Sequence, residues 1–227
     1  MIAADLSRCR LYGILDLSYV ESAELTKVAE QMMDGGADLI QLRAKTHSCA
    51  QIAALAVDLH RCTAARGVPL VINDHPEVAR IVPAEGVHVG QDDLPVAEVR
   101  EMAGPNCMLG KSTHSLDQAI RAFYEGADYI GFGPIFATPT KPDYPAIGLE
   151  EIRKVHEAVP IPIFCIGGIK LDNLPKVIEA GARRVVMVSG WLQAKDIVAY
   201  ARAAKELLNR KPHPPEADAN PKSQCPS

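Results

Sequence analysis

Short apolar runs alternate with longer amphipathic runs eight times along this chain, and that alternation limits the folds available to it. The apolar runs indicate β-strands at residues 11–15, 38–43, 69–73, 86–89, 108–111, 129–133, 163–166 and 185–188. The longer runs place apolar residues at three- and four-residue spacing, as helices do, at residues 23–34, 49–66, 94–103, 116–125, 149–158 and 194–208. Eight strand–helix units of about 25 residues each predict an α/β protein, a single (β/α)₈ TIM barrel. A doubly wound open sheet is the alternative.

Glycine marks the end of three of these helices. Gly36, Gly126 and Gly181 each stand just before an expected strand, where a turn from helix to strand often needs a left-handed residue. Beyond residue 208 the pattern stops in a stretch rich in proline and poor in apolar residues. We therefore expect one TIM-barrel catalytic domain over residues 1–208 and a disordered Pro-rich tail over residues 209–227.

Composition excludes several classes of partner. The formal net charge of −4 shows no basic excess, so we expect no nucleic-acid partner and no binding to an anionic membrane. No segment approaches about eighteen continuous apolar residues and the N-terminus lacks a signal-peptide pattern, so a cytoplasmic location is expected. The six cysteines form no C-x-x-C pair and are interpreted as reduced thiols. The oligomeric state stays open, and a homo-oligomer is compatible with the sequence.

The end of the second expected strand carries two cations. Alternation along a strand puts Gln41, Arg43 and Lys45 on one face and Leu42 and Ala44 on the other. A solvated strand end would explain them, but cations that converge at a barrel mouth favour an anionic ligand.

Acidic residues follow the third and fourth expected strands. Asp74 follows one strand, and Asp92 and Asp93 follow the next. Adjacent strand ends lie about 5 Å apart, so Asp74 and one of the other two could share a Mg²⁺ ion, which takes one or two carboxylates and substrate phosphate oxygens. Alternatively, Asp74 caps a helix that begins at Pro76.

The remaining strand ends offer hydroxyls, glycines and a lysine. Ser112 follows the fifth strand, where either it or Ser115 could instead cap the next helix. A long loop after the sixth strand contains Thr138, Pro139, Thr140 and Lys141, donors that suit a phosphate. Gly168 and Ser189 follow the seventh and eighth strands, where TIM barrels often bind phosphate through backbone N–H groups.

Seven ordered motifs in this chain resemble those of the thiamine-phosphate synthase (thiamine-phosphate pyrophosphorylase) family, including its thiazole tautomerase branch. They lie at residues 41–45, 73–74, 88–93, 110–114, 133–141, 167–169 and 188–189. The resemblance implies a transferase that joins hydroxymethylpyrimidine diphosphate to thiazole phosphate and releases pyrophosphate. It implies Mg²⁺ as the cofactor and these two phosphorylated small molecules as the partners.

The resemblance also implies roles for residues at matching positions. Asp74 and Asp93 would bind Mg²⁺, and Gln41, Arg43, Lys45, Asn73, Ser112 and Lys141 would hold the pyrimidine diphosphate. Arg43, Lys45, Ser112 and Lys141 are the implied catalytic residues, and Leu42 and Ala44 lie within the same substrate-binding motif. The thiazole phosphate would be held by Thr138, Pro139, Thr140, Gly168, Val188 and Ser189.

Two positions depart from the family pattern: Ala44 stands where glutamate is usual, and His75 where a second aspartate is frequent. A metal-independent tautomerase that uses His114 as its proton shuttle is the second hypothesis. That branch commonly lacks the aspartates and cations that this chain keeps. A non-catalytic barrel that senses a ligand is the third.

Overall fold

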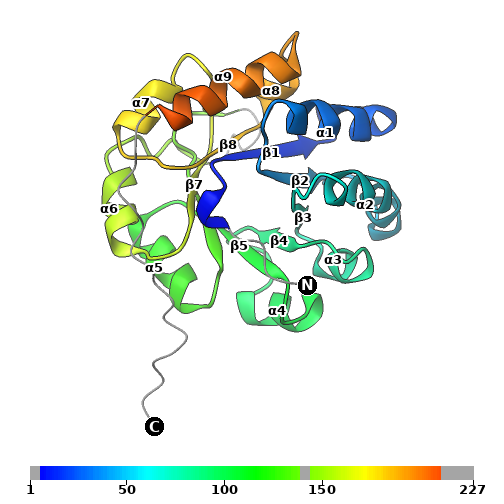
Figure 1. Cartoon of the computed structure of the whole chain (residues 1–227). Helices are drawn as coiled ribbons and strands as arrows, with labels where there is room; N and C mark the ends of the chain where they lie inside the picture. The colour runs from blue at the N-terminus through cyan, green and yellow to red at the C-terminus, as the bar shows by residue number, and fades with distance from the viewer. Residues whose placement is uncertain (1–5, 139–143, 211–227) are drawn as a thin grey trace.

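Eight parallel strands close into a barrel in the order β1 to β8 in the computed structural model, which describes residues 6–138 and 144–210 (Figure 1). The strands are β1 (Leu11–Asp16), β2 (Leu39–Arg43), β3 (Leu70–Asn73), β4 (Gly86–Val89), β5 (Met108–Thr113), β6 (Tyr129–Phe132), β7 (Ile163–Cys165) and β8 (Val185–Met187). Because β1 pairs with both β2 and β8, the barrel closes and the open-sheet alternative is wrong. The TIM barrel expected from the alternating pattern is confirmed.

Helices form the outer ring of the barrel (Figure 1). They are α1 (Leu25–Asp34), α2 (Cys49–Ala64), α3 (Pro76–Ile81), α4 (Val96–Ala103), α5 (Leu116–Tyr124), α6 (Ile152–Ala158), α7 (Leu174–Glu179), α8 (Ser189–Leu192) and α9 (Ile197–Asn209), with 3₁₀ turns η1 (Leu6–Arg8) and η2 (Ser22–Glu24). The helix expected at residues 194–208 begins later, at Ile197. Asp196 precedes it as the N-cap, and its side chain accepts a hydrogen bond from the Ala199 N–H.

The alternation along each strand separates two apolar layers. One face of every strand packs against the helices and forms the larger buried cluster. The opposite face fills the barrel with Tyr12, Leu39, Tyr129, Phe164 and their neighbours. Polar side chains that follow these inward positions along the same strands therefore point into the mouth of the barrel.

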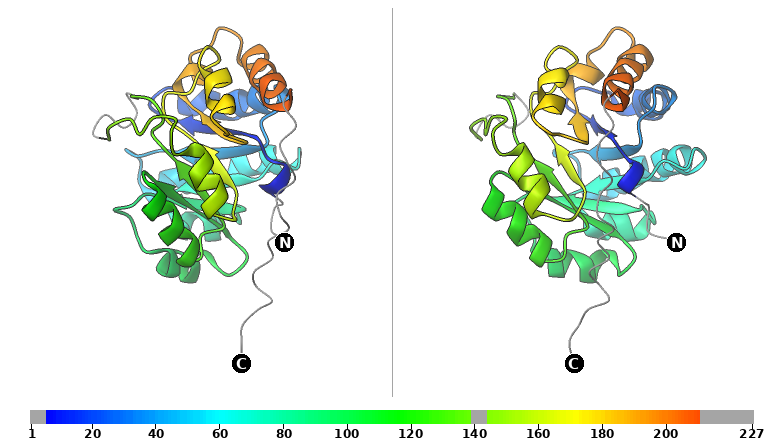
Figure 2. Two further views of the ribbon diagram at one scale, coloured as in Figure 1. Left: turned by 90° about the vertical axis from the view of Figure 1, so that its left-hand side faces the viewer. Right: turned by 60° about the vertical axis from the view of Figure 1, so that its left-hand side comes forward.

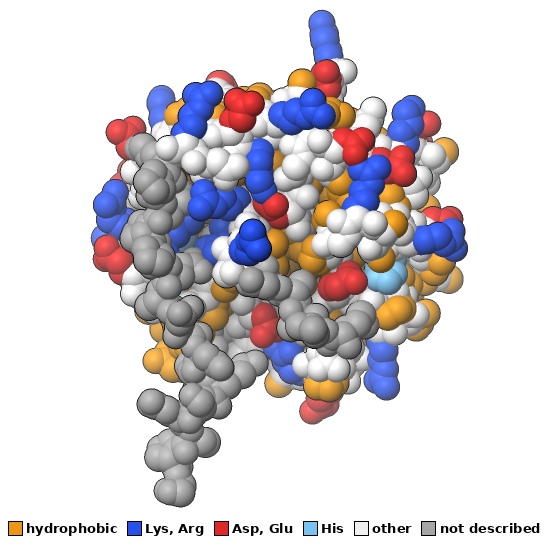
Figure 3. Space-filling model, viewed as in Figure 1, with side chains coloured by type: hydrophobic (Ala, Val, Ile, Leu, Met, Phe, Trp, Pro, Cys, Tyr) orange, Lys and Arg blue, Asp and Glu red, His pale blue; other side chains and the backbone are white. Residues whose placement is uncertain are grey.

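The N-terminal ends of the strands form the closed end of the barrel. Figure 2 shows η1 at this end and the connection after β6 at the opposite end. Leu6 of η1 packs into the interior cluster, and the buried Arg184 donates to the backbone carbonyls of Leu6 and Ser7. Lysine, arginine, aspartate and glutamate side chains are mixed over this face (Figure 3). Because η1 fills this end of the barrel, a ligand site is expected at the opposite end.

The predicted glycine turns lie at the same closed end. Gly36, Gly126 and Gly181 have φ values of 103°, 91° and 114°, as their role after a helix requires. The turns at Gly36 and Gly126 are each followed by an aspartate that hydrogen-bonds to the start of a neighbouring strand. Asp38 accepts from the Leu11 N–H and Asp128 from the Leu109 N–H, each at 2.9 Å. These turns therefore serve the fold.

Some expectations fall outside the described residues: Pro139, Thr140, Lys141 and the part of the tail from residue 211 onward. The expected start of the tail at residue 209 is wrong, because α9 continues to Asn209 and Arg210 is its C-cap. Over residues 6–138 and 144–210, no helix combines the length and the apolar character that a membrane crossing requires.

Candidate active site

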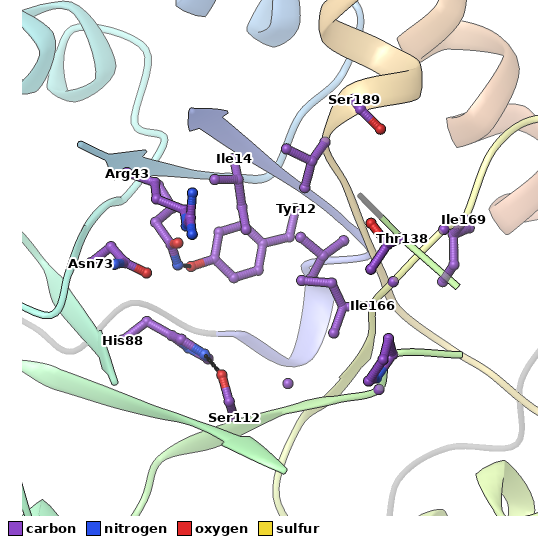
Figure 4. A pocket seen from close by; sticks show the side chains of 18 of the residues that line it. Tyr12, Ile14, Arg43, Asn73, His88, Ser112, Thr138, Ile166, Ile169 and Ser189 are labelled. Carbon is purple, nitrogen blue, oxygen red and sulfur yellow. Dashed lines mark hydrogen bonds between the residues drawn. The ribbon is translucent and has the colours of Figure 1, made fainter. Parts of the chain in front are cut away.

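A cavity opens at the C-terminal end of the barrel, where side chains from the strand ends converge (Figure 4). Tyr12 lies on its floor. Arg43, Asn73, His88 and Ser112 lie on one side of that ring, and Thr138, Ile169 and Ser189 lie on the other. The arrangement brings together residues that are separated by more than 140 positions in the sequence. It also divides the cavity into a cationic side and a hydroxyl side.

Asp16 orients the arginine of the cationic side. The two residues are partners in the β1–β2 register, and Arg43 Nη1 lies 2.6 Å from Asp16 Oδ2. Both side chains are largely buried, and Asp16 Oδ1 also accepts from the Ser18 N–H at 2.9 Å. A guanidinium held by a buried carboxylate points in one direction and is prepared to meet a second anion.

Asp74 accepts hydrogen bonds from two other polar side chains on this side. Its Oδ2 accepts from Lys45 Nζ and, at 2.6 Å, from Asn73 Nδ2. Its backbone has a φ of 64°, in the left-handed region, and its N–H donates to the His88 carbonyl at 2.9 Å. Asp74 does not cap α3, because the N-cap of that helix is His75. The cap alternative for Asp74 is therefore wrong.

Asp93 lies beside Asp74, close enough for the two carboxyl groups to share a proton. Burial raises the pKa of Asp74, and the hydrogen bond to Asp93 adds to this effect although Lys45 opposes it. For Asp93, burial also acts to raise the pKa, but the Gly90 N–H at 2.6 Å and the Asp74 carboxyl bring it below its usual value. Two adjacent carboxyl groups competing for one proton form a ready site for a hard cation.

A chain of hydrogen bonds crosses the cavity floor. It runs from Gln41 Nε2 to the Tyr12 hydroxyl at 2.5 Å, then to the Tyr129 hydroxyl at 3.2 Å. His88 continues it, with Nδ1 3.2 Å from the Tyr129 hydroxyl and Nε2 3.0 Å from Ser112 Oγ. Burial raises the pKa of both tyrosines far above the ordinary value, so the hydroxyls stay protonated. The chain therefore fixes Gln41 and Ser112 from opposite sides of the floor.

Gly110 leaves room for this chain. A Cβ at position 110 would overlap both the Tyr129 ring and the His88 imidazole. Only a residue without a side chain lets the histidine and the tyrosine meet inside the barrel.

The hydroxyl side contains Thr138, Ser189 and the backbone around Gly168. Gly168 has a φ of 64°, and a Cβ there would lie 2.8 Å from the Ala137 carbonyl oxygen. Ser189 begins α8, directly after the inward-facing Val188. A close-packed glycine backbone, two hydroxyls and the first turn of a short helix suit a phosphate group.

His114 also lines the cavity. Its Nδ1 contacts the Gly133 carbonyl oxygen, and its ring stacks on Tyr144 with centroids 4.4 Å apart. The α5 cap is Ser115, whose side chain accepts from the Gln118 N–H, so Ser112 remains directed into the cavity.

Most of the predicted residues in the described part of the chain meet at this cavity. Lys45, Asp74 and Asp93 do not line it themselves, and Asp74 lies beside the lining residue Asn73. Leu42 and Ala44 differ further, because their side chains pack in the layer between strands and helices and can offer a ligand only backbone atoms. Sequence reasoning missed Asp16, Tyr12 and Tyr129, and it assigned no role to His88 beyond its place in the motif at residues 88–93. The alternation of inward residues along β1 was the available signal for Tyr12 and Asp16.

Comparisons with known proteins find relatives that cover most of the chain. Residues 11–191 match a family described as thiamine monophosphate synthase. A thiamine-phosphate synthase from Shouchella clausii is 44% identical over 195 residues, 86% of this chain and 93% of that protein. One from Chloroflexus aurantiacus is 43% identical over 210 residues, 92% of this chain and 97% of that protein.

Solved structures also superpose on this chain. A thiamine phosphate pyrophosphorylase from Pyrococcus furiosus superposes with a TM-score of 0.81 at 32% identity, over 89% of this chain and 96% of that one. A 3-hexulose-6-phosphate synthase superposes with a TM-score of 0.67 at 16% identity, over 87% of this chain and 99% of that one, and shows only a shared fold.

Proposed function

The chain belongs to the thiamine monophosphate synthase family, and from that premise we propose that it is a transferase that makes thiamine phosphate. It would join hydroxymethylpyrimidine diphosphate to thiazole phosphate. The bond from the pyrimidine methylene to the diphosphate oxygen breaks, a bond from that methylene to the thiazole nitrogen forms, and pyrophosphate leaves. The observation that carries the proposal is the division of one cavity into a cationic side and a hydroxyl side.

The cationic side suits the diphosphate. Arg43, held by Asp16, presents its guanidinium at the mouth, and Lys45 is half exposed beside Asp74. Positive groups that are already oriented stabilise negative charge as it develops on a leaving group. Asn73 and Ser112 add hydrogen-bonding groups on the same side of the cavity. Lys141, which lies outside the described residues, is proposed as a further cation of this side.

The residues present also fit a Mg²⁺ ion. Asp74 and Asp93 offer two adjacent carboxyl groups, and a divalent cation between them would offset the repulsion of their negative charges. When bound there, the ion would supply positive charge to the diphosphate oxygens. Lys45, which is paired with Asp74 and half exposed, would add a positive charge for the same diphosphate.

The hydroxyl side and the cavity walls suit the second substrate. Thr138, Gly168, Val188 and Ser189 are proposed to hold the thiazole phosphate, with Pro139 and Thr140 outside the described residues. Apolar side chains, including Ile14, Ile166 and Val186, line the space between the two sides. Such walls exclude water, which would otherwise capture a methylene carbon that has lost its leaving group.

The site requires no strong general base, because a neutral thiazole nitrogen can attack the methylene directly. The cations and carboxyl groups around Arg43 and Asp74 favour the synthase over the tautomerase, although His114 lines the same cavity and could move a proton there. The proposal includes a cytoplasmic location, since no disulfide joins the cysteines of the described residues, as is usual in a reducing compartment.

One assay tests the proposal. The full chain is mixed with both phosphorylated substrates, with Mg²⁺ or with a chelator, and thiamine phosphate and pyrophosphate are measured. We expect equal amounts of the two products with Mg²⁺ and little of either with the chelator. Interconversion of thiazole tautomers without any coupling would instead establish the tautomerase.

A further inference from the structure

Three side chains of metal-binding type meet outside the cavity, where α2 and α3 begin. Cys49 is the first residue of α2, and His75 and Glu77 flank Pro76 at the start of α3. Their ligand atoms all lie within 4.8 Å of one another. We propose that these three residues form a second metal site, which binds a borderline-soft divalent cation such as Zn²⁺.

The distances between the three atoms match those around such an ion. Cys49 Sγ lies 3.5 Å from His75 Nδ1 and 3.1 Å from Glu77 Oε1, and these last two atoms are 3.0 Å apart. Zinc bonds of about 2.3 Å to sulfur and about 2.1 Å to nitrogen and oxygen, at tetrahedral angles, place such ligands roughly 3.4 to 3.6 Å apart. A shift of the exposed Glu77 side chain by about half an ångström would complete the fit.

The backbone already holds the three ligands in place. Ser48 and Gln51 form a capping box around the first turn of α2, which fixes the position of Cys49. Pro76 fixes the backbone between His75 and Glu77. Ligands on the ends of two helices are held better than ligands on a loop, so little ordering would oppose binding.

The chemistry of the three ligands selects the metal. Sulfur and imidazole nitrogen favour Zn²⁺, Co²⁺ or similar ions, whereas Mg²⁺ prefers oxygen ligands. This site therefore differs in selectivity from the Asp74–Asp93 pair, even though His75 directly follows Asp74. The Cys49 thiol donates to Glu77, and this hydrogen bond raises the pKa of the thiol. The metal would replace that proton, so binding releases one proton, and the exposed side leaves a fourth position for water.

Titration of the full chain with Co²⁺ in the presence of a phosphine reductant tests the proposal without any substrate. We expect a near-ultraviolet absorption band from charge transfer between sulfur and Co²⁺, which one equivalent of Zn²⁺ removes and excess Mg²⁺ leaves. Loss of a second-sphere partner alone typically weakens metal binding by roughly 10- to 100-fold, so Cys49→Ser and His75→Ala should each weaken it by at least about 100-fold.

Two other cysteines provide matched controls. Cys62 lies in α2 beside Glu30, with sulfur and carboxylate oxygen 3.9 Å apart, but belongs to no cluster of three ligands among the described residues. Cys225 lies in the tail. Cys62→Ser and Cys225→Ser should keep the band, and Zn²⁺ should raise the Tm of both but not that of Cys49→Ser. Absence of the band in the natural chain, or its survival in Cys49→Ser, would overturn the proposal.

Discussion

Asp16 holds Arg43 at the mouth of the barrel through an ion pair of 2.6 Å between the ends of β1 and β2. The aspartate side chain is only 2% exposed and the arginine side chain 15%. Because a buried guanidinium without its partner is costly, this pair fixes the direction of the charge that the proposed diphosphate would meet.

Replacing Asp16 with asparagine tests this positioning role. The change keeps the shape of the side chain but removes the charge that orients Arg43. We expect kcat/KM for the pyrimidine diphosphate to fall roughly ten- to hundredfold, the size of one charge-assisted hydrogen bond. Steady-state kinetics with each substrate varied in turn measures this fall, which should appear mainly in the KM of the diphosphate.

Asp38→Asn is the matched control. Asp38 also pairs with a cation, Lys205, and accepts from the Arg10 and Leu11 N–H groups, but it lies at the closed end of the barrel. The Asp38→Asn variant should have a lower Tm and unchanged KM values for both substrates. If both variants showed the same kinetics, the role of Asp16 would be structural only.

Tyr129→Phe breaks the hydrogen-bond chain across the cavity floor. The variant leaves Tyr12 and the His88 Nδ1 without their shared partner, so about 1–3 kcal/mol of folding stability should be lost. Since Gln41 and Ser112 are then held less firmly, kcat/KM for the pyrimidine diphosphate should fall about tenfold, equivalent to 1.4 kcal/mol. Thermal melts and kinetics measure the two effects.

Tyr200→Phe is the matched control for Tyr129→Phe, because it removes a tyrosine hydroxyl that does not belong to the hydrogen-bond chain. The Tyr200 hydroxyl accepts from the Leu171 N–H at 3.2 Å and takes no part in the chain. Its loss should lower the Tm without changing the KM for the pyrimidine diphosphate. Unchanged kinetics in Tyr129→Phe would mean that the chain only fills the barrel.

The sequence predicts well what depends on local periodicity. The eight strand–helix units and the inward direction of Gln41 and Arg43 follow from periods of two or 3.6 residues. The three glycine turns follow from the left-handed backbone that glycine favours after a helix. The strand expected at residues 129–133 is observed as β6, which ends one residue earlier, at Phe132.

Contacts that depend on strand register or helix packing could not be predicted in this way. Asp16 meets Arg43 only because β1 and β2 pair in one particular register. Tyr12 and Tyr129 meet across the barrel although 117 positions separate them in the sequence. Cys49 approaches His75 only once α2 and α3 lie side by side. A single sequence carries no local signal for such distances.

Two truncations test where the fold ends. Leu208 is fully buried and its carbonyl accepts from Arg10 Nη1 at 2.8 Å, so the barrel needs the chain to this point. A chain that ends at Arg210 should keep its Tm and its activity. A chain that ends at Leu207 should lose roughly 5 to 10 °C, from ~2–3 kcal/mol of burial. A lower Tm for the first truncation would show that residues beyond 210 stabilise the barrel.

The last prediction distinguishes the synthase from the tautomerase by the order of two variants. In a synthase, pyrophosphate leaves only when positive charge offsets its negative charge, and Asp93 would help to hold the Mg²⁺ ion that supplies this charge. No proton moves on the thiazole before attack. Asp93→Ala should then slow coupling at least about a hundredfold. His114→Ala should slow it by roughly tenfold or less, because coupling moves no proton through the ring, which packs on Tyr144 and contacts the Gly133 carbonyl.

A tautomerase would reverse that order. Proton transfer by a positioned side chain is commonly worth roughly 10² to 10⁴ in rate, so His114→Ala would abolish isomerisation while chelation of Mg²⁺ would change nothing. Measuring coupling and isomerisation for both variants, with and without Mg²⁺, therefore gives opposite rankings for the two enzymes. We expect the synthase ranking, because the cavity mouth carries two cations and two carboxyl groups that isomerisation of a thiazole would not use. These are Arg43, Lys45, Asp74 and Asp93.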